Sequence, residues 1–170
     1  MRSSVDASVI ISCFNQAHYL GSAIESSLAQ SYSNREIIVV DDGSIDGSAK
    51  VAESYDGVRL ISQRNRGIAG ARNAGLEESR GRYLVFLDAD DTLLPTAVEK
   101  AVQCCQAPDV VKVHWPLWGV NEQGRKTGRL IPQGTLPEGD LRPTLVREGP
   151  LTTATPPTSG NAWTRPVLEK

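Results

Sequence analysis

The chain has 170 residues, of which 39% are hydrophobic and 22% charged, and its formal net charge is −2. This length is enough for one domain with a buried core and too short for two large ones. The charge balance excludes the strongly basic surface typical of nucleic-acid-binding proteins. No apolar run approaches the roughly 20 residues that span a bilayer.

The cysteines and histidines give no sign of a disulfide framework or a zinc site. Cys13, Cys104 and Cys105 are odd in number, and none has the spacing of a zinc finger. His18 and His114 are too far apart in sequence to suggest a metal pair. The N-terminus is too polar for a signal peptide. We therefore expect a cytoplasmic protein with reduced thiols, and peripheral association with the inner face of a membrane stays open.

Short apolar runs alternate with helix-like segments over the first two thirds of the chain. We expect strands at 8–14, 36–40, 58–62, 82–87 and 109–114. Leu20, Ile24 and Leu28 recur every four residues and predict a helix between the first two strands. Ser44 or Asp46 is expected to cap the second helix, and Gly81 to end the third in the C′ position.

Strand and helix in alternation predict an α/β fold. The sheet should be mostly parallel, with right-handed crossovers and helices on both faces, and residues 1–115 should form this core. Residues 116–170 are expected to belong to the same domain. They should contain a hairpin that turns near Asn121–Gly124, a loop from 132 to 158 rich in Pro, Gly and Thr, and a final segment.

The chemically suggestive residues follow the predicted strands, where an open α/β sheet binds its ligands. They are Ser12, Phe14, Asn15, Asp41, Asp42, Arg64, Arg66, Arg72, Asp88, Asp90 and Asp91. An aromatic ring, two sets of carboxylates and several guanidinium groups at one edge suit a nucleoside diphosphate with a divalent metal.

Each of these residues also has a purely structural alternative. Asp41 and Asp42 could build a turn, and Asp90 or Asp91 could cap the helix after Pro95. Arg72 could be a surface arginine and Phe14 a core residue. Glycines in this region lack the G-x-G-x-x-G order of dinucleotide-binding loops. Single signals are therefore weak, and their convergence on one edge is the stronger observation.

The segment 85–93, "VFLDADDTL", also resembles the nucleophile motif of haloacid-dehalogenase-like phosphatases. In that alternative Asp88 is the nucleophile and Asp90 the general acid. Three features oppose it: Asp91 stands where that family has glycine, the motif follows the fourth strand and not the first, and no second acidic pair follows.

Four blocks in order over residues 8–95, about half of the chain, resemble family 2 glycosyltransferases of the GT-A fold. They are "SVIISCFNQAHYLGSAIESSLAQSY", "EIIVVDDGSIDGS", "NRGIAGARNAG" and "GRYLVFLDADDTLLP". A weaker match, "TSGNAWTRPVLEK", is similar to the acceptor-side segment of these enzymes. The resemblance implies a Rossmann-like core with a sugar-nucleotide site.

The resemblance also implies a role for each matching residue. Ser12 and Phe14 would line the base pocket, Phe14 by stacking. Asp42, with Asp41 beside it, would hydrogen-bond the base, and Arg72 would be the basic residue of that pocket.

In the D-x-D motif formed by residues 88–90, Asp88 would contact the ribose. Asp90 would coordinate Mg²⁺ or Mn²⁺ that bridges the two phosphates.

The implied reaction is metal-dependent transfer of a sugar, with a UDP-sugar as the expected donor and hexosyl transfer in polysaccharide biosynthesis as the expected type. The acceptor would be a hydroxyl of a saccharide, a lipid-linked molecule or a protein. Transfer would invert the anomeric centre, with a later carboxylate as base.

The position of that base raises a second expectation. After residues 159–162, "SGNA", only Glu169 is acidic, and Glu138, Asp140 and Glu148 lie upstream in the loop. We therefore expect an N-terminal fragment, with the base beyond Lys170, that binds donor and metal but transfers sugar poorly or not at all. The alternative is a non-catalytic nucleotide-binding module of the same fold.

Overall fold

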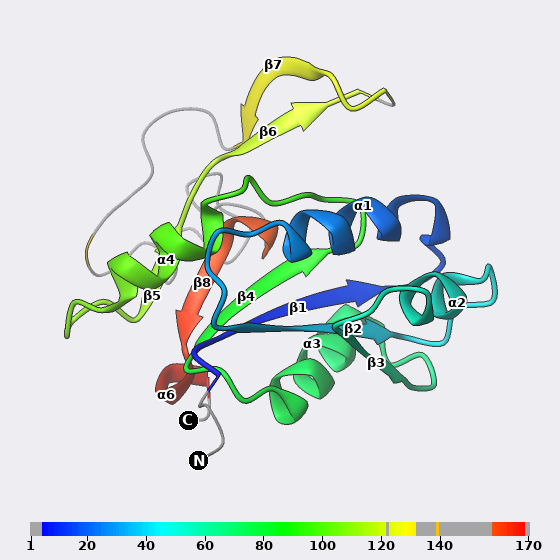
Figure 1. Ribbon diagram of the computed structural model, residues 1–170, viewed down its shortest axis with the longest axis horizontal. Helices are drawn as coiled ribbons and strands as arrows, with labels where there is room; N and C mark the ends of the chain where they lie inside the picture. The colour runs from blue at the N-terminus through cyan, green and yellow to red at the C-terminus, as the bar shows by residue number, and fades with distance from the viewer. Residues whose placement is uncertain (1–4, 122, 132–138, 140–157, 169–170) are drawn as a thin grey trace, which may run out of the picture.

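The computed structural model describes residues 5–121, 123–131, 139 and 158–168. Within these residues a six-stranded sheet has the order β3-β2-β1-β4-β8-β5, and β6 and β7 form a separate two-stranded sheet (Figure 1). The strands are β1 (Ala7–Cys13), β2 (Arg35–Asp41), β3 (Val58–Ser62), β4 (Tyr83–Asp88), β5 (Lys112–His114), β6 (Leu117–Val120), β7 (Lys126–Ile131) and β8 (Asn161–Thr164). The helices are α1 (Ala17–Leu28), α2 (Ser48–Glu53), α3 (Gly67–Glu78), α4 (Ala97–Cys105), η1 (Thr158–Gly160) and α6 (Arg165–Leu168).

The four strands β3, β2, β1 and β4 are parallel and end nearly level with one another. Ser12 is the register partner of Asp88, and Cys13 is the partner of Asp41. The residues that follow β1, β2 and β4 therefore meet at one edge of the sheet, as the sequence predicts.

The sheet separates two apolar cores because alternate strand residues point to opposite faces. Val9 and Ile11 pack in the core that includes residues of α1, α2 and α4, whereas Ile10 packs in the core that includes α3. Figure 1 shows α1 and α4 on one side of the sheet and α3 on the other. Strands buried on both faces explain the uninterrupted apolar runs of the sequence. The predicted α/β fold, with a mostly parallel sheet and helices on both faces, is confirmed.

Strand β8 departs from the expected parallel pattern. It lies between β4 and β5 and is antiparallel to both. The last described segment of the chain thus returns to the central sheet, so β5 does not pair with β4 directly.

Two predicted helix ends are wrong in detail. The N-cap of α2 is Gly47, with φ of 94°, and not Ser44 or Asp46. The Asp46 carboxylate nevertheless accepts a hydrogen bond from the Ser48 N–H at 3.0 Å, because it lies one residue before the cap. Gly81 is not a helix C′ residue, since α3 ends at Glu78 with Ser79 as its extended C-cap. A Cβ at Gly81 would lie 2.6 Å from the Ser8 nitrogen, so close packing requires this glycine.

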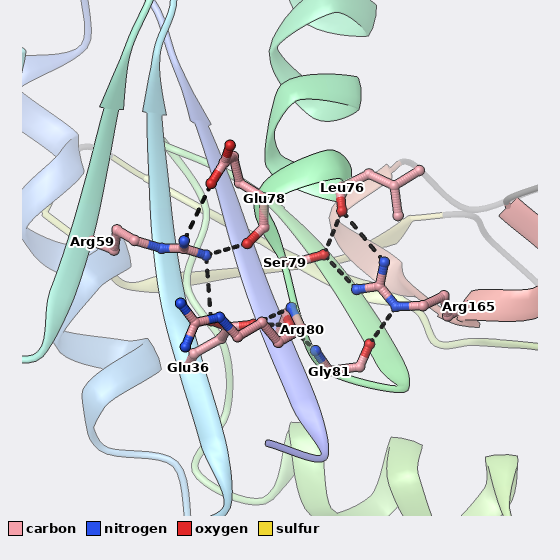
Figure 2. Close-up of polar contacts among 9 residues, drawn as sticks. Glu36, Arg59, Leu76, Glu78, Ser79, Arg80, Gly81 and Arg165 are labelled. Atoms are coloured by element: carbon pink, nitrogen blue, oxygen red, sulfur yellow. Dashed lines mark hydrogen bonds and ion pairs between the residues drawn. The ribbon is translucent and has the colours of Figure 1, made fainter. Parts of the chain in front are cut away.

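The amino ends of the strands carry a polar network on the edge opposite the aligned strand ends (Figure 2). Arg59 pairs with Glu36 at 3.4 Å. Arg165 donates to the Gly81 carbonyl at 2.8 Å and to the Ser79 hydroxyl at 2.6 Å. These bonds attach α6, and with it the end of β8, to the loop that joins α3 and β4.

The predicted hairpin is confirmed by the antiparallel pair β6–β7, whose turn includes a hydrogen bond from the Gly124 N–H to the Asn121 carbonyl at 2.8 Å. The predicted loop from 132 to 158 falls mostly outside the described residues. Glu138, Asp140, Glu148 and Glu169 also lie outside them. None of the helices that the structure describes is long and apolar enough to cross a membrane.

Candidate functional site

A cavity of about 370 Å³ opens at the carboxyl edge of β1, β2 and β4. Its lining includes five residues that the sequence places in a donor site: Ser12, Phe14, Asp42, Asp88 and Asp90. The loop before α3 and its first turn complete the wall with Asn65, Gly67 and Ile68. Arg72 and Asp41, both described, are not among the lining residues.

Asp88 is held at the end of β4 by two neighbouring groups. Arg72 Nη2 lies 2.8 Å from Asp88 Oδ1, and the Ser12 hydroxyl donates to the same oxygen at 3.2 Å. The two charged side chains are 21% and 28% exposed, so the pair is mostly shielded from water. The Arg72 Nε is buried and has no hydrogen-bond partner among the described residues. Arg72 therefore acts on the cavity through Asp88 and is not a plain surface arginine.

Asp42 is 2% exposed and ties the β3–α3 loop to the cavity wall. Its Oδ1 accepts hydrogen bonds from Gln63 Nε2 at 2.6 Å and from the Arg66 N–H at 2.9 Å. Asp41 is also buried, but its Oδ1 accepts the Ser44 N–H at 3.2 Å within the turn after β2. The structural alternative thus describes the geometry of Asp41, whereas Asp42 carries a carboxylate to the cavity.

The apolar side of the cavity is formed by exposed side chains. Phe14 is 48% exposed, so its ring is not a core residue. Asn15 follows it in the left-handed region, with φ of 53°, where asparagine is one of the few tolerated residues. The Asn15 Oδ1 accepts the Ile45 N–H at 2.9 Å and fixes this turn. The exposed ring offers a face on which a flat ligand can stack.

The turn after β4 concentrates three carboxylates. The Asp91 N–H donates to the Asp88 carbonyl at 3.0 Å, which closes the turn around Asp90. Burial, and then the charges of Asp90 and Asp88, raise the pKa of Asp91, while a hydrogen bond from Ser159 opposes this shift. Helix α4 begins at Ala97 with Thr96 as its N-cap, so neither Asp90 nor Asp91 caps it. Carboxylates this close repel one another. The Arg72 guanidinium offsets the repulsion at Asp88, and a cation bound at Asp90 would offset it there.

The donor chemistry of this turn fits Mg²⁺ or Mn²⁺. Among the residues that the structure describes, no three His, Cys, Asp or Glu side chains are grouped as a complete metal site. Magnesium is usually held by one or two carboxylates together with the phosphates of a substrate. Asp90 lines the cavity and is exposed there, next to the carboxylate of Asp88. These hard oxygen donors fit a metal that shares its remaining ligands with a diphosphate.

Sequence reasoning did not find two residues that shape the site. Gln63 holds the Asp42 carboxylate, and Ser159 accepts the Asp88 N–H at 2.9 Å. The sequence does carry one sign of the role of Gln63, because this residue directly follows the third predicted strand. The block "SGNA" contains Ser159, but the contact of Ser159 with β4 depends on the antiparallel placement of β8.

Two solved structures resemble the fold of the chain. The crystal structure of S. aureus TarS 1-349 superposes with a TM-score of 0.74 over 96% of this chain and 48% of that one, at 23% identity. TarS 1-349 has also been solved in complex with UDP and with UDP-GlcNAc. The mannosyltransferase PcManGT from Pyrobaculum calidifontis, in complex with GDP-Man and Mn²⁺, superposes with a TM-score of 0.68 over 96% of this chain and 45% of that one, at 21% identity. The expected GT-A fold is thereby confirmed.

Sequence comparison assigns the family. The uncharacterized glycosyltransferase alr2836 of Nostoc sp. is 40% identical over 168 residues, which cover 96% of this chain and 52% of that protein. The chain thus spans about half the length of this relative. The family model described as glycosyl transferase family 2 matches residues 8–162, including the cavity residues and Ser159. On this match the chain belongs to glycosyl transferase family 2.

Proposed function

We propose that the chain binds a nucleoside-diphosphate sugar, with a UDP-sugar as the expected donor, and transfers the sugar to an acceptor hydroxyl with inversion. One observation carries the proposal: the exposed Phe14 ring, the Asp42 carboxylate and the acidic turn at Asp88–Asp90 line a single cavity. The UDP and UDP-GlcNAc complexes of TarS support this donor class. Family membership favours sugar transfer over the phosphatase alternative.

In this proposal each cavity residue contacts a different part of the donor. The Phe14 ring stacks on the base, and Asp42, already fixed by the Arg66 N–H, accepts hydrogen bonds from the base. Ser12 lies on the same wall. Asp88, oriented by Arg72, accepts a hydrogen bond from the ribose. A single orientation of its carboxylate reduces the entropy lost when the donor binds.

Asp90 is the metal-binding carboxylate of the proposal. Mn²⁺ in the PcManGT complex supports a divalent ion, either Mg²⁺ or Mn²⁺. When bound, such an ion offsets the negative charge that develops as the nucleoside diphosphate departs. The contribution of the chain is to keep Asp90 exposed within a turn whose first and last residues, Asp88 and Asp91, are hydrogen-bonded.

Titration calorimetry with UDP and with GDP, in EDTA and in Mn²⁺, tests the proposal. We expect the chain to bind at least one nucleotide more tightly with Mn²⁺, and Asp90→Ala to abolish that gain. Asp56→Ala is the matched control, because it removes an exposed carboxylate from the turn before β3, at the opposite edge of the sheet. Equal binding with and without Mn²⁺, or no binding of either nucleotide, would refute the site. Turnover of any UDP-sugar would exclude the non-catalytic module, whereas binding without turnover is expected of both alternatives given above.

A further inference from the structure

The segment that contains β8 contacts the acidic turn through one buried hydroxyl. Ser159 lies in η1, directly before β8, and is 1% exposed. Its Oγ accepts the backbone N–H of Asp88 at 2.9 Å. This side chain therefore binds the first residue of the turn that carries Asp90.

The hydroxyl is used here as an acceptor, which its lone pairs allow. It accepts from the Asp88 amide, and the Asp91 N–H closes the turn on the Asp88 carbonyl at 3.0 Å. The backbone on either side of Asp90 is thereby fixed by hydrogen bonds, while Asp90 itself stays exposed on the cavity.

We propose that Ser159 is a positioning residue, which holds the Asp88–Asp91 turn in the geometry that binds a divalent ion together with a diphosphate. The inference rests on the proposed function above. Ser159 does not line the described cavity, so its effect passes through the turn. Partners that orient metal-binding carboxylates without touching the metal typically change metal affinity by about 10–100-fold.

The same segment provides a matched control at its other end. Because β8 is antiparallel to β4, Asn161 pairs with Phe86 near the cavity edge and Thr164 pairs with Tyr83 at the start of β4. Beyond Thr164, Arg165 binds the loop between α3 and β4 on the opposite edge (Figure 2). Arg165→Met therefore loosens the segment without removing a bond to the acidic turn, whereas Ser159→Ala removes the bond to the Asp88 N–H.

The test measures Mn²⁺ affinity and metal-free nucleotide affinity separately in the whole chain. The electron paramagnetic resonance signal of free Mn²⁺, at saturating UDP, gives the first, and calorimetry in EDTA gives the second. For Ser159→Ala we expect Mn²⁺ to bind about tenfold more weakly, with metal-free UDP binding unchanged. For Arg165→Met we expect wild-type Mn²⁺ affinity and a lower melting temperature.

The outcomes separate this inference from the proposed function. If the wild type binds neither UDP nor Mn²⁺ with UDP, the proposed function fails and the inference fails with it. If the wild type binds both and Ser159→Ala retains its Mn²⁺ affinity, only the inference is overturned. It is also overturned if Arg165→Met weakens Mn²⁺ binding as much as Ser159→Ala does. Equal weakening of metal-free and metal-supported binding in Ser159→Ala would show a structural role instead.

Discussion

The ion pair between Arg72 and Asp88 makes a quantitative prediction for stability. At 4 Å, two unit charges interact by about 4 kcal/mol at an effective dielectric constant of 20. The observed Nη2–Oδ1 distance is 2.8 Å, but both side chains retain about a quarter of their exposure, so water screens part of this energy. A surface ion pair contributes little to stability, whereas breaking a buried pair costs about 3–5 kcal/mol. The Arg72–Asp88 pair lies between these cases, so we expect a coupling energy of about 1–2 kcal/mol.

A double-mutant cycle isolates that coupling. Single variants are ambiguous here, because Asp88→Asn breaks the pair with Arg72 and also relieves repulsion from Asp90 and Asp91. Urea unfolding of the wild type, Arg72→Met, Asp88→Asn and the double variant gives the interaction term directly. Arg59→Met combined with Asp88→Asn is the control, since Arg59 pairs with Glu36 at the other edge of the sheet.

The control cycle should be additive within about 0.3–0.5 kcal/mol. A coupling between Arg72 and Asp88 no larger than that of the control would show that the pair does not hold the Asp88 carboxylate. The proposed orientation of Asp88 toward the ribose would then lose its physical basis.

Three further predictions concern packing, pH and thiol chemistry. Gly75→Ala would place a methyl group 2.3 Å from a β1 side chain, so we expect the free energy of unfolding in urea to fall by about 1–3 kcal/mol; an unchanged midpoint would contradict the close packing of α3. Burial, and then its hydrogen bond to Asp6, raise the pKa of Tyr32 to about 12. The unfolded tyrosine loses its proton near pH 10, so wild-type stability should fall between pH 10 and 12. This fall should be smaller in Tyr32→Phe than in the wild type, and equal alkaline slopes in urea series would refute it. Burial, and then the charge of Cys104, raise the pKa of Cys105 to about 11. Ellman's reagent at pH 8 should therefore find one fast-reacting thiol, the exposed Cys104, which Cys104→Ser removes. A second fast-reacting thiol would show that Cys105 is accessible.

The parallel core could be predicted from sequence because its physical signal is local. Strands buried on both faces need continuous apolar runs, and these runs mark β1 to β4 almost to the residue. The level strand ends then follow from the parallel pairing, and they bring Ser12, Asp42 and Asp88 together. The location of the site at one edge of the sheet could thus be predicted, whereas the contacts between its side chains could not.

The antiparallel strand β8 could not be predicted in the same way. It has four residues, too few for a clear period, and its partners in β4 lie more than 70 positions earlier in the chain. The hydrogen bond between Ser159 and Asp88 depends on that pairing, and so it was missed as well.

Local rules failed where tertiary contacts decide the conformation. The sequence predicts that Gly81 ends a helix, but the glycine is required because the β1 backbone approaches it closely. Asp41 and Asp42 are equivalent in sequence, and only the structure shows that the first closes a turn while the second reaches the cavity. The resemblance assigns Arg72 to the base pocket, which stays a prediction, and the structure shows its guanidinium group 2.8 Å from Asp88.

The position of manganese in a crystal of the chain grown with UDP and Mn²⁺ tests the proposed donor site most directly. We predict an anomalous diffraction peak within about 2.5 Å of an Asp90 carboxylate oxygen, with the diphosphate on its other side and the base on the Phe14 ring. A nucleotide bound outside the cavity, or manganese away from the Asp88–Asp91 turn, would contradict the proposed donor site.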